Sequence, residues 1–154
     1  MWGRECTVNS REAEELVVKG VAAVENNHIH LALVCFQRAG ELGKNPTVSS
    51  GLGYCLAAAR GEVEKGTLLC REAIVLDPDN VFHYCNLGSV LLLAGKKDEA
   101  IEVFRQGLRI TKDEGIIRKL EALGTRKPPV IGFLGRKHFL NKSLGFILSR
   151  LGFR

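Results

Sequence analysis

Apolar residues over the first 123 positions recur every three or four residues, the spacing that places them on one face of a helix. Short turns interrupt this pattern at Asn26-Asn27, Arg60-Gly61 and Ala94-Gly95, where the residue types favour turn or left-handed conformations. Asp77-Pro78 makes a further break, because proline cannot continue a helix. The pattern predicts seven helices, which span residues 13–25, 29–42, 46–59, 63–76, 81–93, 97–110 and 114–123.

The helical pattern also repeats with a period of 34 residues. Four positions in each copy are separated by 4, 3 and 3 residues, so they share one helical face. The copies carry Ala32, Phe36, Ala39 and Leu42, then Gly66, Cys70, Ala73 and Leu76, then Ala100, Phe104, Gly107 and Ile110. The preceding helix of each copy contains a glycine, at Gly20, Gly53 or Gly88. Because glycine inside a helix costs about 1 kcal/mol relative to alanine, its recurrence predicts a close approach between helices.

This organisation resembles the tetratricopeptide repeat (TPR) family, whose helix hairpins have the same period. The third copy is the most similar, because Tyr84-Cys85-Asn86-Leu87-Gly88 matches the family's aromatic-x-Asn-Leu-Gly and Asp98-Glu99-Ala100 follows in register. Leu76-Asp77-Pro78 matches the family's closing Leu-Asp-Pro. The second copy departs from the family pattern at Ser49, Gly66 and Cys70.

The resemblance implies an all-α fold, an α-α superhelix (solenoid) of three helix hairpins with a capping helix over the last one. The function it implies is protein–protein recognition without catalysis. The expected divisions are a lead-in (1–12), a TPR-like domain (13–124) with repeats at about 13–45, 46–80 and 81–114 and a capping helix at 114–123, a Pro/Gly linker (125–137), and a basic amphipathic tail helix (138–154).

Members of the family bind partner peptides or helices in a concave groove lined by the first helix of each hairpin. In this register the groove positions are Val17, Val21, Val24, Ser50, Tyr54, Ala57, Phe82, Cys85, Ser89 and Leu92. Some members hold a C-terminal carboxylate with Lys and Asn where this chain has Val17 and Val21, so we expect no such clamp here. A mostly apolar groove favours an amphipathic helix or an extended apolar peptide, although single positions in this set can equally belong to the core.

The last 33 residues differ in charge from the rest of the chain. Residues 1–121 hold 15 Lys/Arg and 17 acidic residues, whereas residues 122–154 hold seven Lys/Arg and no acidic residue. Beyond Lys127-Pro128-Pro129, apolar residues return at helical spacing. The tail positions expected to make contacts are Phe139, Leu140, Leu144, Ile147, Leu148 and Leu151. Three roles stay open for this tail: docking in cis on the repeats, capturing a partner in trans, or binding an anionic membrane surface, with nucleic acid less favoured.

We therefore expect a cytoplasmic adaptor or chaperone-like protein that is not an enzyme and uses no metal or cofactor. Its five cysteines are odd in number and lack a Cys-x-x-Cys pair, which favours reduced thiols in a reducing compartment. No run approaches the roughly 18 apolar residues of a membrane-spanning helix, and the first residues lack the features of a secretory signal. The alternative function is a peripheral membrane or nucleic-acid binder that acts through the basic tail.

Overall fold

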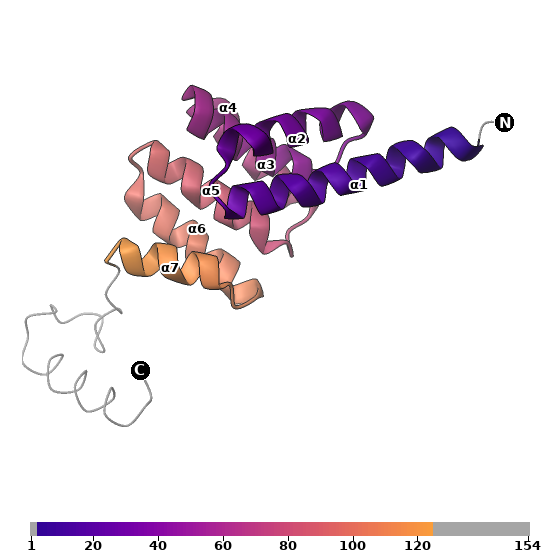
Figure 1. The fold of residues 1–154 in the computed structure, drawn as a ribbon. Helices are drawn as coiled ribbons and strands as arrows, with labels where there is room; N and C mark the ends of the chain where they lie inside the picture. The colour runs from indigo at the N-terminus through magenta and orange to yellow at the C-terminus, as the bar shows by residue number, and fades with distance from the viewer. Residues whose placement is uncertain (1–2, 125–154) are drawn as a thin grey trace, which may run out of the picture. The chain divides into compact units, whose positions relative to one another are not determined.

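The computed structural model describes the backbone of residues 3–124 and the side chains of residues 10–124. Within this range the chain is entirely helical, apart from its connections (Figure 1). The helices are α1 (Gly3–Glu25), α2 (Ile29–Leu42), α3 (Pro46–Arg60), α4 (Val63–Leu76), α5 (Val81–Leu93), α6 (Lys97–Ile110) and α7 (Glu114–Ala122).

Six helices lie within one residue of their predicted bounds at each end, whereas α1 begins at Gly3 instead of residue 13. Residues 4–12 contain neither glycine nor proline, so nothing in this segment interrupts a helix. Arg11 and Glu15, one turn apart on α1, form an exposed ion pair of 3.4 Å. The apolar pattern missed these early turns because it detects the face that packs against a neighbour, and that face begins later along α1.

Each hairpin turn places one residue in the left-handed region, at the same period of 34 residues. These residues are Asn27, Gly61 and Gly95, with φ values of 59°, 72° and 73°. Glycine adopts this conformation freely, and asparagine tolerates it better than most residues do. The three predicted turns are therefore confirmed.

Side chains cap the helices that begin each new unit after the first. The backbone N–H of Thr47 donates to Asn45 Oδ1 at 2.8 Å at the start of α3, and that of Phe82 donates to Asn80 Oδ1 at 3.2 Å at the start of α5. At the start of α7, the N–H of Ile116 donates to Asp113 Oδ1 at 2.7 Å. The second helices α2, α4 and α6 begin without a side-chain cap, so their starts depend on the preceding turn.

The helices pair in sequence order, as a stacked solenoid requires. α1 packs against α2, α3 against α4 and α5 against α6, while α3 also packs against α2 and α5, and α7 against α6 (Figure 1). The largest fully buried side chains include Phe36, Phe104, Leu91 and Ile116. This arrangement confirms the predicted hairpin solenoid and its capping helix. Among residues 3–124, none of the helices combines the length and apolar character needed to cross a membrane.

In the first and third hairpins, an aromatic ring fills the space beside a glycine on the facing helix. A Cβ placed on Gly20 would lie 2.7 Å from Cε1 of Phe36, and one on Gly88 would overlap the ring of Phe104. Phe36 also lies against Gly51 of the next hairpin. Because these rings occupy the volume of the missing side chains, they can be fully buried between helices.

The second hairpin packs its two helices closely with smaller residues. Cys70 replaces the aromatic ring, and a Cβ on Gly53 would lie 2.8 Å from the carbonyl oxygen of Gly66 and 3.2 Å from the Sγ of Cys70. The backbones of α3 and α4 therefore approach each other directly. The departures at Gly66 and Cys70 from the family pattern act together to permit this approach.

The tight contact predicts opposite effects for two glycine substitutions. Gly53→Ala should destabilise the protein by about 1–3 kcal/mol, because the new methyl group meets backbone that cannot move aside alone. Gly40→Ala on α2 should stabilise it by about 0.5–1 kcal/mol, because its Cβ meets only Val48 Cγ1 at an ordinary 3.6 Å. Urea unfolding followed by circular dichroism measures both, and a stabilising Gly53→Ala would contradict the close packing.

The chain divides into two units after Ala122. The expected linker (125–137) and tail helix (138–154) lie outside the described residues. So do the tail positions predicted to make contacts, Phe139, Leu140, Leu144, Ile147, Leu148 and Leu151.

Candidate partner-binding groove

The groove positions expected on α1 are half-buried. Val17, Val21 and Val24 pack against the core cluster that contains Phe36 and keep part of their surface accessible. These valines therefore belong to the edge of the core and also present apolar surface beside it.

The seven groove positions expected on α3 and α5 divide by exposure. Tyr54, Phe82, Cys85 and Leu92 are half-buried, whereas Ser50, Ala57 and Ser89 are buried. The Ser50 side chain is 0% exposed and cannot contact a ligand, because it faces α5 instead of the groove. The Ser89 hydroxyl donates to the carbonyl oxygen of Cys85 at 2.7 Å, a bond within its own helix. The accessible part of this set is therefore apolar apart from the phenol of Tyr54 and the thiol of Cys85.

Tyr54 on α3 and Cys85 on α5, two of the half-buried positions, influence each other electrostatically. Burial raises the pKa of the Tyr54 phenol, and the thiols of Cys55 and Cys85 raise it further. Burial also raises the pKa of the Cys85 thiol, while Lys119 lowers it and Asp113 and Glu25 raise it. The Cys85 thiol is therefore influenced by charges from α1, α7 and the loop before α7.

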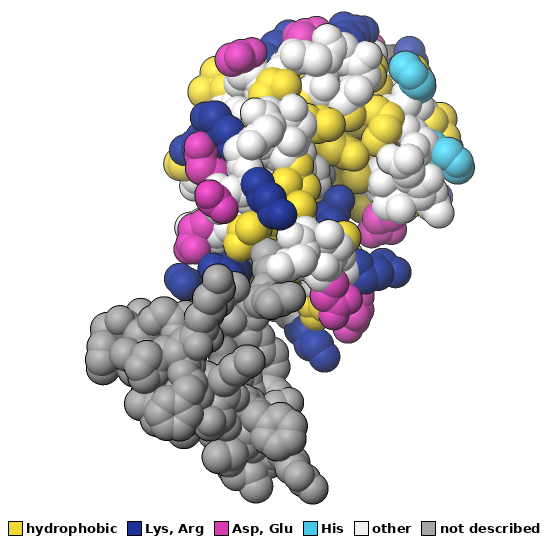
Figure 2. Space-filling view, turned by 90° about the vertical axis from the view of Figure 1, so that its left-hand side faces the viewer, with side chains coloured by type: hydrophobic (Ala, Val, Ile, Leu, Met, Phe, Trp, Pro, Cys, Tyr) yellow, Lys and Arg dark blue, Asp and Glu magenta, His cyan; other side chains and the backbone are white. Residues whose placement is uncertain are grey.

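Apolar side chains gather in a recess on one face of the described part of the molecule (Figure 2). An open hollow of about 680 Å³ lies beside the first hairpin. Only Val17 of the expected groove set lines this hollow, together with Ser10, Ala13, Glu14, Val18, Ala39, Leu42, Gly43, Lys44, Asn45 and Val48. The structure thus presents apolar surface along the first helices and a second concavity at the end where α1 begins the array.

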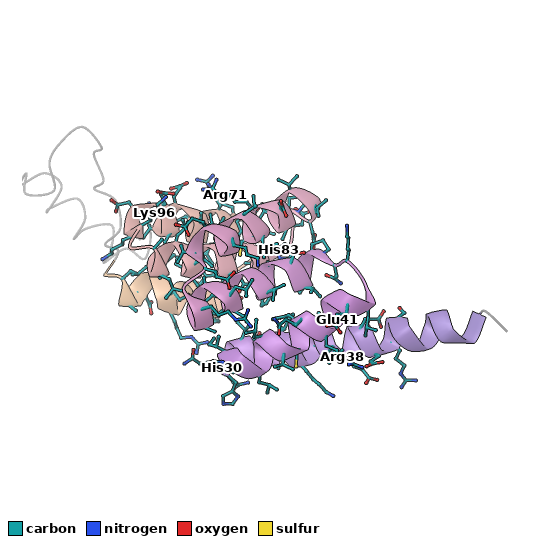
Figure 3. The ribbon with its side chains drawn as sticks, turned by 90° about the horizontal axis from the view of Figure 1, so that it is seen from above. His30, Arg38, Glu41, Arg71, His83 and Lys96 are labelled. Carbon is teal, nitrogen blue, oxygen red and sulfur yellow. The ribbon has the colours of Figure 1, made fainter. Side chains whose placement is uncertain are left out.

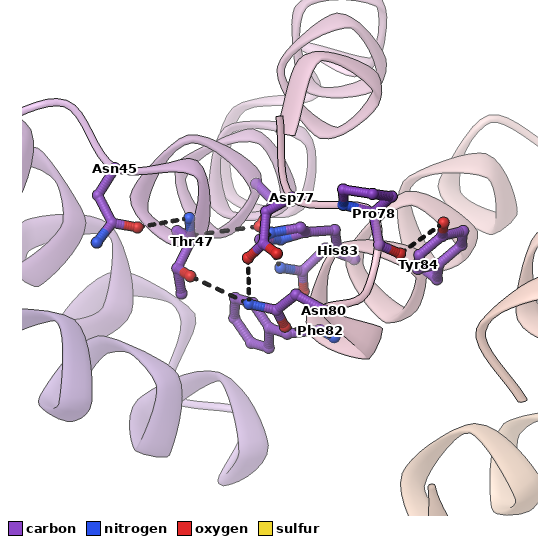
Figure 4. A network of polar contacts seen from close by, with 10 residues as sticks. Asn45, Thr47, Asp77, Pro78, Asn80, Phe82, His83 and Tyr84 are labelled. Atoms are coloured by element: carbon purple, nitrogen blue, oxygen red, sulfur yellow. Dashed lines mark hydrogen bonds and ion pairs between the residues drawn. The ribbon is translucent and has the colours of Figure 1, made fainter. Parts of the chain in front are cut away.

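A polar network joins the second hairpin to the third, beneath the groove positions (Figure 4). Asn80 Nδ2 donates to Asp77 Oδ2 at 3.1 Å and to Thr47 Oγ1 at 3.4 Å. The Tyr84 hydroxyl donates to the carbonyl oxygen of Pro78 at 2.9 Å. The network therefore ties the turn after α4 to the first turns of α3 and α5.

His83 lies at the centre of this network with its side chain 0% exposed. Its Nδ1 is 2.8 Å from Ser50 Oγ, and its Nε2 is 3.4 Å from Asp77 Oδ2 but makes no hydrogen bond of good geometry. Ser50 Oγ also lies 3.3 Å from the carbonyl oxygen of Thr47 and accepts from Asn86 Nδ2 at 3.4 Å. Burial lowers the pKa of His83, and the Asp77 carboxylate beside Nε2 partly opposes this effect.

Ser50, His83 and Asp77 are the residue types of a hydrolase triad, but their placement does not suit that chemistry. A nucleophile must reach a substrate, and the Ser50 hydroxyl is enclosed between helices and held by Asn86. The trio instead satisfies polar atoms at a helix junction.

Sequence reasoning missed His83 and assigned Ser50 to the groove. The available signal was a serine and a histidine on two consecutive first helices whose sequences are mostly apolar. Nothing in the spacing shows that these two side chains point at each other, because that depends on the angle at which α5 packs on α3.

The network predicts a large loss of stability for Asn80→Ala. This change removes the cap of α5 and the two side-chain bonds to Asp77 and Thr47, so the free energy of unfolding should fall by about 1–2 kcal/mol. Asn26→Ala is the matched control, since its amide donates only to the carbonyl oxygen of Ala22 at an exposed site. Equal losses for the two variants in urea unfolding would show that the junction network contributes nothing beyond a local bond.

Residues 69–102 match the tetratricopeptide repeat family model. No curated protein matches the chain. This family match covers the end of the second hairpin and most of the third, where the sequence motifs are most regular.

Solved structures with the same fold are TPR domains. The Arabidopsis OM64 TPR domain is 20% identical, with a TM-score of 0.58 over 75% of this chain and 97% of its own. The Sgt2 TPR domain from Aspergillus fumigatus is 18% identical, with a TM-score of 0.58 over 82% and 92%. The second TPR domain of human RPAP3, solved in complex with the HSP70 peptide SGPTIEEVD, is 17% identical, with a TM-score of 0.55 over 77% and 99%.

Proposed function

We propose that this chain, whose residues 69–102 match the tetratricopeptide repeat model and whose fold is that of TPR domains, is an adaptor that binds an apolar segment of a partner protein along its first helices. The observation that carries the proposal is the set of half-buried apolar side chains at the groove positions of α1, α3 and α5. Apolar surface that stays accessible beside a well-packed core commonly marks an interaction site.

The groove positions favour an apolar partner over an acidic one. Val17 and Val21 stand where a carboxylate clamp has Lys and Asn, and Phe82 and Cys85 on α5 add no positive charge. Near Cys85 the described charged groups are Glu25, Asp113 and Lys119, which include two acids for one base. An acidic peptide such as the one bound by human RPAP3 would find little to neutralise its carboxylates here.

Half-burial also suits the capture of an amphipathic helix. Tyr54 and Leu92 offer a ring and an aliphatic chain with part of their surface accessible. Tyrosine is enriched among the residues that dominate the binding energy of interfaces, and leucine adds apolar area that a partner can bury. A partner helix would cover this surface with its own apolar face.

The location we propose is the cytoplasm. The thiols of Cys35, Cys55, Cys70 and Cys85 are all unpaired within the described part of the chain. Reduced thiols on a protein-binding scaffold are typical of a reducing compartment.

Replacing an accessible apolar side chain in the groove with aspartate should weaken peptide capture. Leu92→Asp and Tyr54→Asp are expected to reduce the affinity for a fluorescein-labelled amphipathic helix of leucine and lysine by roughly tenfold or more, since each loses a buried contact at the interface. Fluorescence anisotropy measures the affinity, and thermal unfolding shows that each variant still folds. Phe82→Asp is a poorer choice, because the Phe82 ring packs 6.5 Å from that of Phe36.

Val75→Asp is the matched control, since this valine on α4 is 81% exposed and lies outside the groove set. It should leave the affinity unchanged. If Val75→Asp weakens binding as much as Leu92→Asp does, the partner binds the second helices and the proposed groove is wrong.

The missing clamp leads to a second expectation for the same assay. The peptide SGPTIEEVD should bind at least about tenfold more weakly than the leucine–lysine helix, because its carboxylates would meet valine in place of lysine and asparagine. Tight binding of SGPTIEEVD would contradict the apolar character assigned to the groove.

A further inference from the structure

We propose that His83 is an acid-sensitive contact between the second and third hairpins, so that its protonation loosens the packing of α5 against α3. The consequence for the groove, which these two helices share, rests on the proposed function. The loosening itself does not depend on any ligand.

The packing of the helices removes the His83 ring from the solvent-accessible surface. Its side chain is 0% exposed and lies among the helices, whereas His30 lies at the outer edge of α2 (Figure 3). The Nδ1 of His83 and Ser50 Oγ lie 2.8 Å apart and form a hydrogen bond whose direction depends on the tautomer of the ring, while the Asp77 carboxylate lies on the other side.

Hydrogen bonding alone would not prevent protonation of Nδ1. The Ser50 hydroxyl can turn to donate to the carbonyl oxygen of Thr47, 3.3 Å away, and then accept from both Nδ1 and Asn86. The cost is instead the burial of a positive charge away from water, which is large unless the charge is well paired. Asp77 offers incomplete compensation, because its Oδ2 lies 3.4 Å from Nε2 without a well-formed hydrogen bond.

Among the described residues, Asp77, which follows α4, is the one charged group that faces His83 from a neighbouring element. From α3 it meets the Ser50 hydroxyl, and on its own helix Asn86 donates to that same hydroxyl. The Cys70 thiol of α4, which donates to the Ser50 carbonyl oxygen at 3.4 Å, stays protonated because burial raises its pKa to about 12. No second carboxylate is therefore at hand to hold an imidazolium ion.

The direction of the pH effect follows from the lowered pKa. The unfolded chain takes up a proton near the ordinary value of 6.5, whereas the folded chain does so only at lower pH. The stabilising contribution is therefore complete above 6.5 and is lost as the pH falls below that value, until the pKa of the folded state is reached.

Looser packing of α5 against α3 at His83 would also change the groove. The Phe82 ring lies 6.4 Å from that of His83 and 6.5 Å from that of Phe36, so it links the junction to the first hairpin. Phe82 and Cys85 on α5 and Tyr54 on α3 are groove positions, and their spacing depends on how α5 packs on α3.

Urea unfolding of the full chain between about pH 7.5 and pH 5 tests the inference. In the wild type, the folding equilibrium constant should fall below pH 6.5 by up to roughly tenfold per pH unit. His83→Gln, which keeps an amide near Ser50 but does not titrate, should lose this dependence. The double variant His28→Gln/His30→Gln, at two exposed positions, should keep it.

The imidazole signals of the wild-type chain give a second measurement that does not require a variant to fold. Their titration by NMR should place the pKa of His83 below the ordinary value of 6.5. Asp77→Asn should lower the pKa of His83 further and extend the loss of stability to lower pH, an effect that a purely structural role would not produce. Titration of His83 at or above 6.5, an unchanged pH dependence in His83→Gln, or no shift in Asp77→Asn would overturn the inference.

Binding of the leucine–lysine helix at about pH 7.5 and pH 5.5 separates this inference from the proposed function. Weaker binding at the lower pH in the wild type, absent in His83→Gln, would support the coupling of the junction to the groove. If the helix binds at neither pH while the stability of the wild type still depends on His83, the proposed function fails and the acid-sensitive junction stands.

Discussion

The distance between the two helices of each hairpin is the constraint on which the rest of the structure depends. Gly20 and Gly88 leave room for the rings of Phe36 and Phe104, while Gly53 meets the backbone of Gly66 directly. A ring of this size, fully buried between helices, contributes several kcal/mol of apolar stabilisation. These contacts set how each first helix lies on its partner, and they thereby determine which side chains α1, α3 and α5 leave accessible for binding.

Much of the fold could be predicted from the sequence because repeated local signals agree with one another. Helical spacing, left-handed turn residues at Asn27, Gly61 and Gly95, and the 34-residue period all indicate the same hairpins. The early turns of α1 could not be predicted because residues 3–12 lack a regular apolar face. The groove was harder to predict, because register assigns a position to a helix but leaves open which neighbour its side chain faces. Ser50 illustrates this limit, since it occupies an expected groove position yet contacts His83.

The junction between the second and third hairpins combines two requirements that usually conflict. The first helices must pack closely enough to form a continuous core, and under the proposed function they must also keep apolar surface accessible to a partner. Polar side chains at the junction, from Thr47 to Asn80, satisfy one another, while Tyr54 on α3 and Leu92 on α5 keep part of their apolar surface accessible. The packing of this junction would therefore affect a partner bound in the groove, because α3 and α5 belong to both the junction and the groove.

The direct contact between α3 and α4 makes the second hairpin structurally different from the first and the third. Gly66 and Cys70 suit each other, because the small thiol fits the narrow spacing that the glycine allows. Changing Cys70 alone to the phenylalanine of the other copies would require the two helices to move apart, and changing Gly66 alone to their alanine would collide with α3. The second hairpin therefore has an epistatic pair at its centre, which confines evolutionary exchange between the copies to paths that alter both residues together.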